Sequence, residues 1–63
     1  MIDIKETINQ SGLNQKDFAA MLDRMPEQIS RWYNGRRMLS PMTEERVRRI
    51  CKENDIEVFD KKS

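Results

Sequence analysis

Histidine is absent from this sequence, and cysteine occurs once, at Cys51. A structural zinc site is built from several Cys or His side chains, so these scarcities argue against one, and no disulfide can form within the chain. A single cysteine fits a reducing compartment, where the thiol packs as a small apolar group. We therefore expect neither a metal nor another cofactor.

Long apolar runs are also missing. Residues 1–10, MIDIKETINQ, carry acidic and polar side chains where a secretory signal needs an apolar run. No stretch approaches the roughly 20 apolar residues of a membrane-spanning helix. We expect a cytoplasmic protein that has no membrane partner.

The chain is short, at 63 residues, and has only two glycines. A chain of this size forms one domain and buries only about 60% of its unfolded surface, so its core is thin. We expect the domain to cover residues 1–59 and residues 60–63 to fray. Without histidine or a phosphate-cradling glycine loop, and without room for a ligand domain, neither an enzyme nor a small-molecule receptor is expected.

Charge is plentiful but nearly balanced, because the formal net charge is +1. Its distribution is uneven: between Arg24 and Arg49 seven arginines stand against three glutamates, a local excess of +4. A basic middle of this kind can mark a nucleic-acid surface. Charge alone still favours the simpler interpretation, an ordinary solvated helical surface.

Apolar residues recur at helical spacing almost throughout, and no segment alternates like a strand. Capping residues and breakers predict helices over about residues 3–11, 14–23 and 26–34, then a fourth that Ser40 or Thr43 caps and Asn54-Asp55 ends. Residues 56–59 form either a short fifth helix or an extended tail. The expected fold class is all-α, a compact bundle of four to five short helices.

The predicted helix 26–34 has two unlike faces. At 100° per residue, an apolar back collects four side chains: Met25, Ile29, Trp32 and Tyr33. The front carries Glu27, Arg31 and Asn34, flanked by Gln28 and Ser30. We expect the back to anchor the helix to the core, which leaves the front free for a ligand.

The two middle helices are spaced like a helix-turn-helix. Helix 14–23 has the small Ala19 at its middle, a tight turn follows, and the next helix turns Ile29 and Trp32 inward. In a helix-turn-helix the second helix lies in the DNA major groove. The alternative is an ordinary four-helix bundle with a polar solvent face.

The run LNQKDFAAML followed by MPEQISRWYNGRR resembles the DNA-binding domain of the phage-repressor/Cro-like (lambda-repressor-like) helix-turn-helix family. The matching features are NQ opening the second helix, Ala19, the spacing P..IS.W..G, and a proline leading into the fourth helix. The resemblance covers Leu13 to about Ile56. It implies a prokaryotic or phage-encoded Cro-like repressor that binds a double-stranded, palindromic DNA operator as a homodimer.

Three positions depart from the family pattern. Asp23 stands where the tight turn usually has glycine, although aspartate tolerates left-handed backbone better than most residues. Tyr33 replaces a common acidic residue, and Asn54 replaces a common leucine.

Site residues follow from side-chain chemistry and from the resemblance. Arginine can pair with the guanine edge, glutamine with adenine, and glutamate with the amino group of cytosine. Glu27 either reads a base or holds Arg31 in position, and Ser30 lies on the border between base and phosphate. We expect base contacts from Glu27, Gln28, Arg31 and Ser30, and phosphate contacts from Asn14, Gln15, Asn34, Arg36 and Arg37.

A homodimer, weak without DNA, is expected because a single recognition helix covers only a few base pairs. Its interface is assigned to hydrophobic residues of the loop before the fourth helix and of the tail: Met38, Leu39, Met42 and Phe59. The loop residues among them could instead fold back over the core. A protein-interaction module of the same fold, antitoxin-like or an adaptor subunit, is the alternative function.

Overall fold

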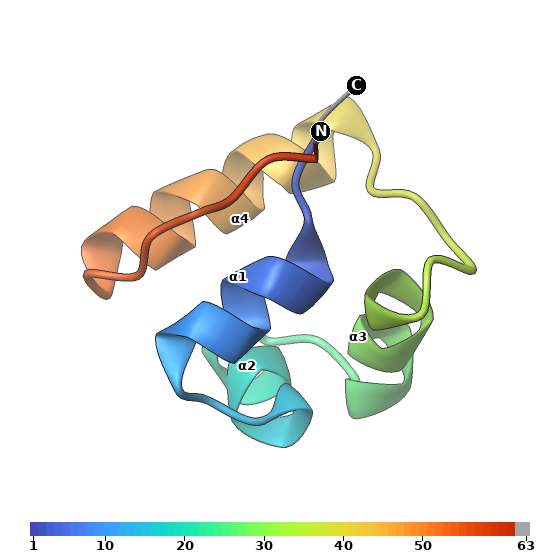
Figure 1. Cartoon of the computed structure of the whole chain (residues 1–63), viewed down its shortest axis with the longest axis horizontal. Coiled ribbons are helices and arrows are strands. Elements are labelled where there is room, and N and C mark those ends of the chain that lie inside the picture. Colours follow the sequence, from blue (N-terminus) through green and yellow to red (C-terminus); the bar gives the residue numbers. More distant parts are fainter. Residues whose placement is uncertain (62–63) are drawn as a thin grey trace.

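The computed structural model describes residues 1–61 and contains four helices within them (Figure 1). They are α1 (Ile4–Ser11), α2 (Gln15–Leu22), α3 (Pro26–Tyr33) and α4 (Pro41–Glu53). The predicted all-α class is confirmed. The longest helix, α4, has 13 residues, and no helix in residues 1–61 combines the length and apolarity needed to cross a membrane.

Three of the helices begin with a side-chain cap. The carboxylate of Asp3 accepts from the Glu6 N–H at 3.0 Å, and Asn14 accepts from the Asp17 N–H at 2.7 Å. Of the two caps considered for α4, the structure has Ser40, whose hydroxyl accepts from the Thr43 N–H at 3.2 Å. α3 has no side-chain cap at Met25 and begins with Pro26, whose missing N–H leaves no donor unsatisfied.

Left-handed residues close α2 and α4 in the same way. Asp23 follows α2 with φ 56°, and the N–H of Arg24 donates to the carbonyl of Ala19 at 2.9 Å. Asp55 follows α4 with φ 58°. This hydrogen-bonding pattern is a Schellman motif, in which the left-handed position normally holds glycine. The aspartate expected to tolerate the turn after α2 does adopt it.

The core lies between the four helices and is built from aliphatic residues around Phe18. Apolar residues at helical spacing fill it: Ile4, Ile8, Phe18, Ala19, Leu22, Ile29, Val47 and Cys51 are buried, whereas Ile50, from the same inner stripe of α4, is half-buried against them. Burial raises the pKa of the Cys51 thiol, so this side chain packs as a neutral group.

Three residues differ from the sequence prediction of the core. Ile2 and Thr7, which no helical pattern singled out, are buried with 1% and 0% of their surface exposed. Met25 was assigned to the apolar back of α3 but is 67% exposed. It precedes the first helical residue and has extended backbone, with φ −71° and ψ 138°, so the helical wheel does not apply to it.

After α4 the chain is an extended tail, which settles the choice left open for residues 56–59. The tail runs back along the N-terminus, where Ile2 and Asp60 form an antiparallel bridge. The Asp3 N–H donates to the Phe59 carbonyl and the Lys61 N–H to the Met1 carbonyl, both at 2.8 Å. We call this pairing the terminal ribbon. Residues 60–63 were expected to fray, but Asp60 and Lys61 belong to the ribbon; residues 62 and 63 lie outside the described part.

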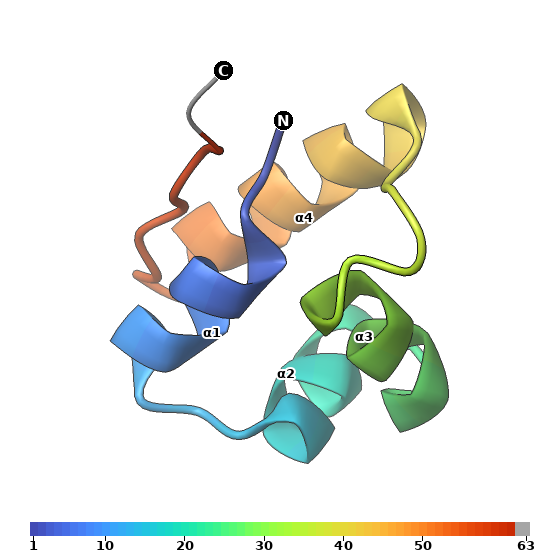
Figure 2. The ribbon, with the colours of Figure 1, turned by 45° about the vertical axis from the view of Figure 1, so that its right-hand side comes forward.

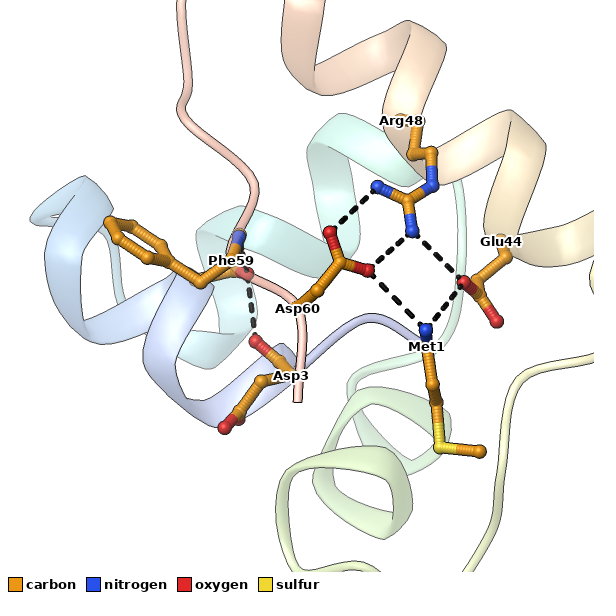
Figure 3. Close-up of polar contacts among 7 residues, drawn as sticks. Met1, Asp3, Glu44, Arg48, Phe59 and Asp60 are labelled. Atoms are coloured by element: carbon orange, nitrogen blue, oxygen red, sulfur yellow. Dashed lines mark hydrogen bonds and ion pairs between the residues drawn. The ribbon is translucent and has the colours of Figure 1, made fainter. Parts of the chain in front are cut away.

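Two sets of side-chain contacts hold the terminal ribbon. The buried Thr7 hydroxyl donates to the Asp3 carbonyl at 2.7 Å and accepts from the Phe59 N–H at 3.2 Å. Beside it, Arg48 donates to both carboxylate oxygens of Asp60 and to Glu44 (Figure 3). The Met1 ammonium lies 3.4 Å from Asp60 and 3.7 Å from Glu44. Each charge in this network therefore has an opposite partner.

Candidate nucleic-acid interface

α3 lies at one edge of the bundle beside α2 (Figure 2). Its two faces carry different side chains, as its sequence predicts. Ile29 is fully buried, and Trp32 and Tyr33 are half-buried against the core. On the front, Glu27 and Arg31 are exposed, while Gln28 and Ser30 are half-buried at its margins. The apolar back fixes the helix, and the polar front faces outward.

Tyr33 attaches α3 to α1. Its hydroxyl donates to the side-chain oxygen of Asn9 at 3.2 Å. The ammonium of Lys5 lies 5.8 Å from the centre of its ring, within the range of a cation–π contact. Both contacts join α3 to α1 through the side chain of Tyr33.

Polar side chains on the front of α3 pair along the helix. Arg31 Nη2 donates to Glu27 Oε1 at 2.9 Å, and these side chains remain 47% and 73% exposed. One turn further on, Asn34 Nδ2 lies 3.3 Å from the Ser30 hydroxyl. The base-reading candidates are thus present on one surface, with Glu27 positioned to orient Arg31.

The start of α2 supplies two candidate phosphate contacts. Asn14 is exposed; its side-chain oxygen caps α2, and its amide nitrogen is the group that can donate to a phosphate. Gln15 is the first residue of α2 and is half-buried. Both views place the beginnings of α2 and α3 on the same lower side of the molecule (Figure 1 and Figure 2). Free backbone N–H groups at a helix start attract anions.

The segment after α3 carries the remaining candidates. Gly35 has φ 73°, and the N–H groups of Arg36 and Arg37 donate to the Arg31 carbonyl at 2.9 and 3.4 Å. Both arginine side chains are exposed, and neither forms an ion pair within residues 1–61. Their backbone is therefore fixed to the end of α3 while their charges stay available.

Two lysines near this surface were not identified from the sequence. Lys5 and Lys61 line a cleft that also includes Asn34 and Gly35. Asp3 is the acidic residue in the same lining. Lys5 comes from α1 and Lys61 from the terminal ribbon, so no local pattern could have linked either of them to the end of α3.

The arginines of α4 are used differently. Arg48 is engaged by Asp60 and Glu44, and Arg49 lies 3.9 Å from Glu53. The pairs with Glu44 and Glu53 join residues one helical turn apart, whereas Asp60 comes from the terminal ribbon. They lie outside the candidate site.

The four residues assigned to a dimer interface fall into two groups. Met38 and Met42 are 64% and 82% exposed. Leu39 is half-buried and packs on the core, as the alternative interpretation of the loop expected. Phe59 is half-buried, with its backbone held in the terminal ribbon. Only the two methionines present most of their surface to solvent.

Comparisons with protein-family models, with curated proteins and with solved structures found no match for this chain.

Proposed function

We propose that this protein is a sequence-specific double-stranded DNA-binding regulator of the Cro-like repressor kind, in which α2 and α3 act as a helix-turn-helix. The observation that carries the proposal is the front of α3. A short helix anchored by Ile29 presents hydrogen-bonding side chains outward, including the paired Glu27 and Arg31. A helix of this width fits the major groove, where base edges display distinct donors and acceptors.

Phosphate contacts on either side of α3 would position it. Gln15 lies at the start of α2, and Arg36 and Arg37 follow the end of α3. Contacts to phosphates fix orientation and register without reading sequence. The arrangement of a base-reading front between two backbone-binding segments supports insertion of α3 rather than contact by an isolated loop.

The second candidate function is a protein-interaction module of the same fold. The exposure of Met25, Met38 and Met42 favours it, because flexible apolar side chains suit protein surfaces. The small net charge of +1 also fits this alternative. The two functions differ in their salt dependence, since only DNA binding releases condensed counterions.

Selection of binding sites from a pool of random duplexes tests the DNA-binding function. We expect enrichment of a two-fold symmetric site whose half-sites lie about 34 Å apart, one helical turn of DNA. Affinity for the enriched site should fall steeply as salt rises. If no sequence is enriched and binding to duplex DNA is insensitive to salt, the protein-interaction function is favoured instead.

We further propose that two copies assemble on the operator, with Met38 and Met42 in the contact. Because the exposed patch is small, its contact area would fall below the roughly 1,200 Å² of a stable complex, so DNA promotes pairing. Met42→Glu should abolish cooperative filling of a palindrome and spare weak half-site binding. Leu39 and Phe59 are less suitable targets, because they are half-buried. Cooperative filling by a folded Met42→Glu variant would remove this residue from the interface.

A further inference from the structure

The Glu27–Arg31 pair places an acceptor directly beside donors on the outward face of α3. Arg31 uses Nη2 toward one carboxylate oxygen, Glu27 Oε1, at 2.9 Å. This contact is single rather than bidentate, so the guanidinium keeps N–H donors on Nη1 and Nη2, and the carboxylate keeps free lone pairs. Both side chains are about half exposed or more, at 47% and 73%.

The pair can therefore bind a ligand without first being broken. An arginine that reads guanine uses parallel N–H groups toward O6 and N7. Nη2 carries two N–H groups and Glu27 takes one of them, so the second remains for a base together with an N–H of Nη1. Taken in order from Arg31 to Glu27, the pair then offers two donors, Nη1 and Nη2, followed by one acceptor, the Glu27 carboxylate.

A G·C base pair displays the complementary order in the major groove. Guanine presents the acceptors N7 and O6, and the cytosine amino group N4 is the donor next to them. We infer that Glu27 and Arg31 act as one preassembled unit that reads a single G·C pair, with Arg31 on guanine N7 and O6 and Glu27 accepting from cytosine N4. This inference rests on the proposed DNA-binding function and names the base pair that the site recognises.

The other base pairs fail at identifiable atoms. In an A·T pair the adenine amino group is a donor where Arg31 Nη2 also donates, and thymine O4 is an acceptor facing the Glu27 carboxylate. A C·G pair presents the same groups in reverse order, so the cytosine amino donor meets an Arg31 donor and the guanine N7 acceptor meets the Glu27 carboxylate. The unit therefore specifies both the composition and the strand orientation of one position in each half-site.

Helix stabilisation alone is a weaker account of the pair. An exposed glutamate–arginine pair at this spacing contributes only about 0.3–0.5 kcal/mol. Glu27 lies in the first turn of α3, where a carboxylate also gains from the helix dipole. A glutamate–arginine pair on the solvent side of any helix would give both effects equally well. Neither effect predicts that affinity for DNA depends on the cytosine amino group.

Chemically altered duplexes of the selected site test the inference. In one duplex the cytosine of the fixed G·C pair is replaced by pyrimidin-2-one, which lacks the 4-amino group; in another the guanine is replaced by 7-deazaguanine, which lacks N7. The wild-type protein should lose roughly tenfold in affinity with each, the effect of one hydrogen bond to a charged group. Glu27→Ala should be insensitive to pyrimidin-2-one and remain sensitive to 7-deazaguanine.

The controls separate this inference from the proposed function. Glu45→Ala removes another exposed glutamate, on α4, and should behave as wild type on every duplex. The same base replacements at a G·C pair outside the half-sites correct for altered duplex stability. Sensitivity of the wild type to 7-deazaguanine without sensitivity to pyrimidin-2-one would overturn the role of Glu27 in reading cytosine, while DNA reading by Arg31 would stand. Absence of any fixed G·C pair in a selected site would also overturn it, and absence of a selected site would overturn both.

Discussion

Two regions of this molecule are rich in charge and use it in opposite ways. Where α4 meets the terminal ribbon, Arg48 contacts Asp60 and Glu44, and the Met1 ammonium contacts the same two carboxylates. On the front of α3, Arg31 has a single contact with Glu27. The first region is a closed network, whereas the second leaves donors and acceptors directed at solvent.

The difference shows which charges maintain the fold and which are available to a ligand. The network around Arg48 joins elements far apart in sequence, so it acts on the position of the tail. The α3 pair joins residues one turn apart and closes no tertiary contact. Net charge could not reveal this distinction, since both regions contain similar residue types. Substitutions that affect one region should therefore leave the other unchanged.

Arg31→Ala should have the largest effect on function and almost none on the fold. We expect a loss of roughly 1–3 kcal/mol in affinity for the selected site and relaxed selection at one base position. Arg49→Ala, which removes an exposed arginine from α4, is the matched control. Equal weakening on selected and random DNA, measured by titration of both duplexes, would refute a base-reading role for Arg31.

Thr7→Val should produce the converse result, a destabilised protein with unchanged DNA specificity. The substitution leaves the Phe59 N–H without its acceptor and should lower the free energy of unfolding by about 1–2 kcal/mol. Urea denaturation measures the change. Thr43→Val is the control at a half-buried threonine on α4, whose hydroxyl bonds only the exposed Ser40 side chain, and it should have a clearly smaller effect than Thr7→Val.

Asp23→Gly should stabilise the fold, because glycine adopts φ 56° without the steric cost of a side chain. The substitution also removes a carboxylate from the negative end of the α2 dipole. A gain of about 1 kcal/mol corresponds to a melting temperature about 4–8 °C higher. Ala20→Gly, inside α2, should shift it in the opposite direction. A lower melting temperature for Asp23→Gly would mean that the carboxylate itself stabilises the turn.

Arg36→Ala tests a proposed phosphate contact just beyond the end of α3. Losing one phosphate contact should weaken binding to all duplexes alike and reduce the salt slope by about one unit. Gln15→Ala should weaken binding equally uniformly but leave the slope unchanged, because its side chain is neutral. An unaltered slope for Arg36→Ala, in titrations over several salt concentrations, would transfer the phosphate contact to Arg37.

Asp60→Asn should give the smallest effect and a characteristic pH dependence. The hydrogen bonds from Arg48, with a contribution from the terminal ammonium, lower the pKa of Asp60. The stability that this carboxylate contributes is therefore complete above the ordinary aspartate pKa of about 3.9 and is lost as pH falls through its lower value in the folded protein.

Melting curves across this pH range provide the measurement. Wild type and Asp60→Asn should differ above about pH 4 and converge in stronger acid. Glu57→Gln, which changes an exposed carboxylate in the tail, should follow the wild type throughout. A constant difference at every pH would show that the asparagine acts through something other than lost charge.

The sequence predicted those parts of the fold that depend on neighbouring residues. Asp3, Asn14, Gly12 and Gly35 are local signals, and the helices begin and end beside them. The front of α3 was predictable for the same reason, because helical periodicity alone separates Glu27 from Ile29.

The remaining features depend on contacts between distant residues. The burial of Ile2 and the contacts of Asp60 require the tail to return to the N-terminus, and nothing within either segment indicates this. Lys5 comes close to α3 only after α1 has packed. The prediction for Met25 was wrong for a different reason. Met25 precedes the first helical residue of α3, so the helical wheel does not apply to it.

The pairing of Ile2 with Asp60 has a consequence for the time course of folding. The α2–α3 pair forms from residues close together in the chain, and such contacts form quickly. The terminal ribbon instead closes a loop that includes nearly the entire chain, and the entropic cost of loop closure rises with loop length. We therefore expect the ribbon to form after the helices have assembled. Destabilising it should accelerate unfolding while leaving the refolding rate nearly unchanged.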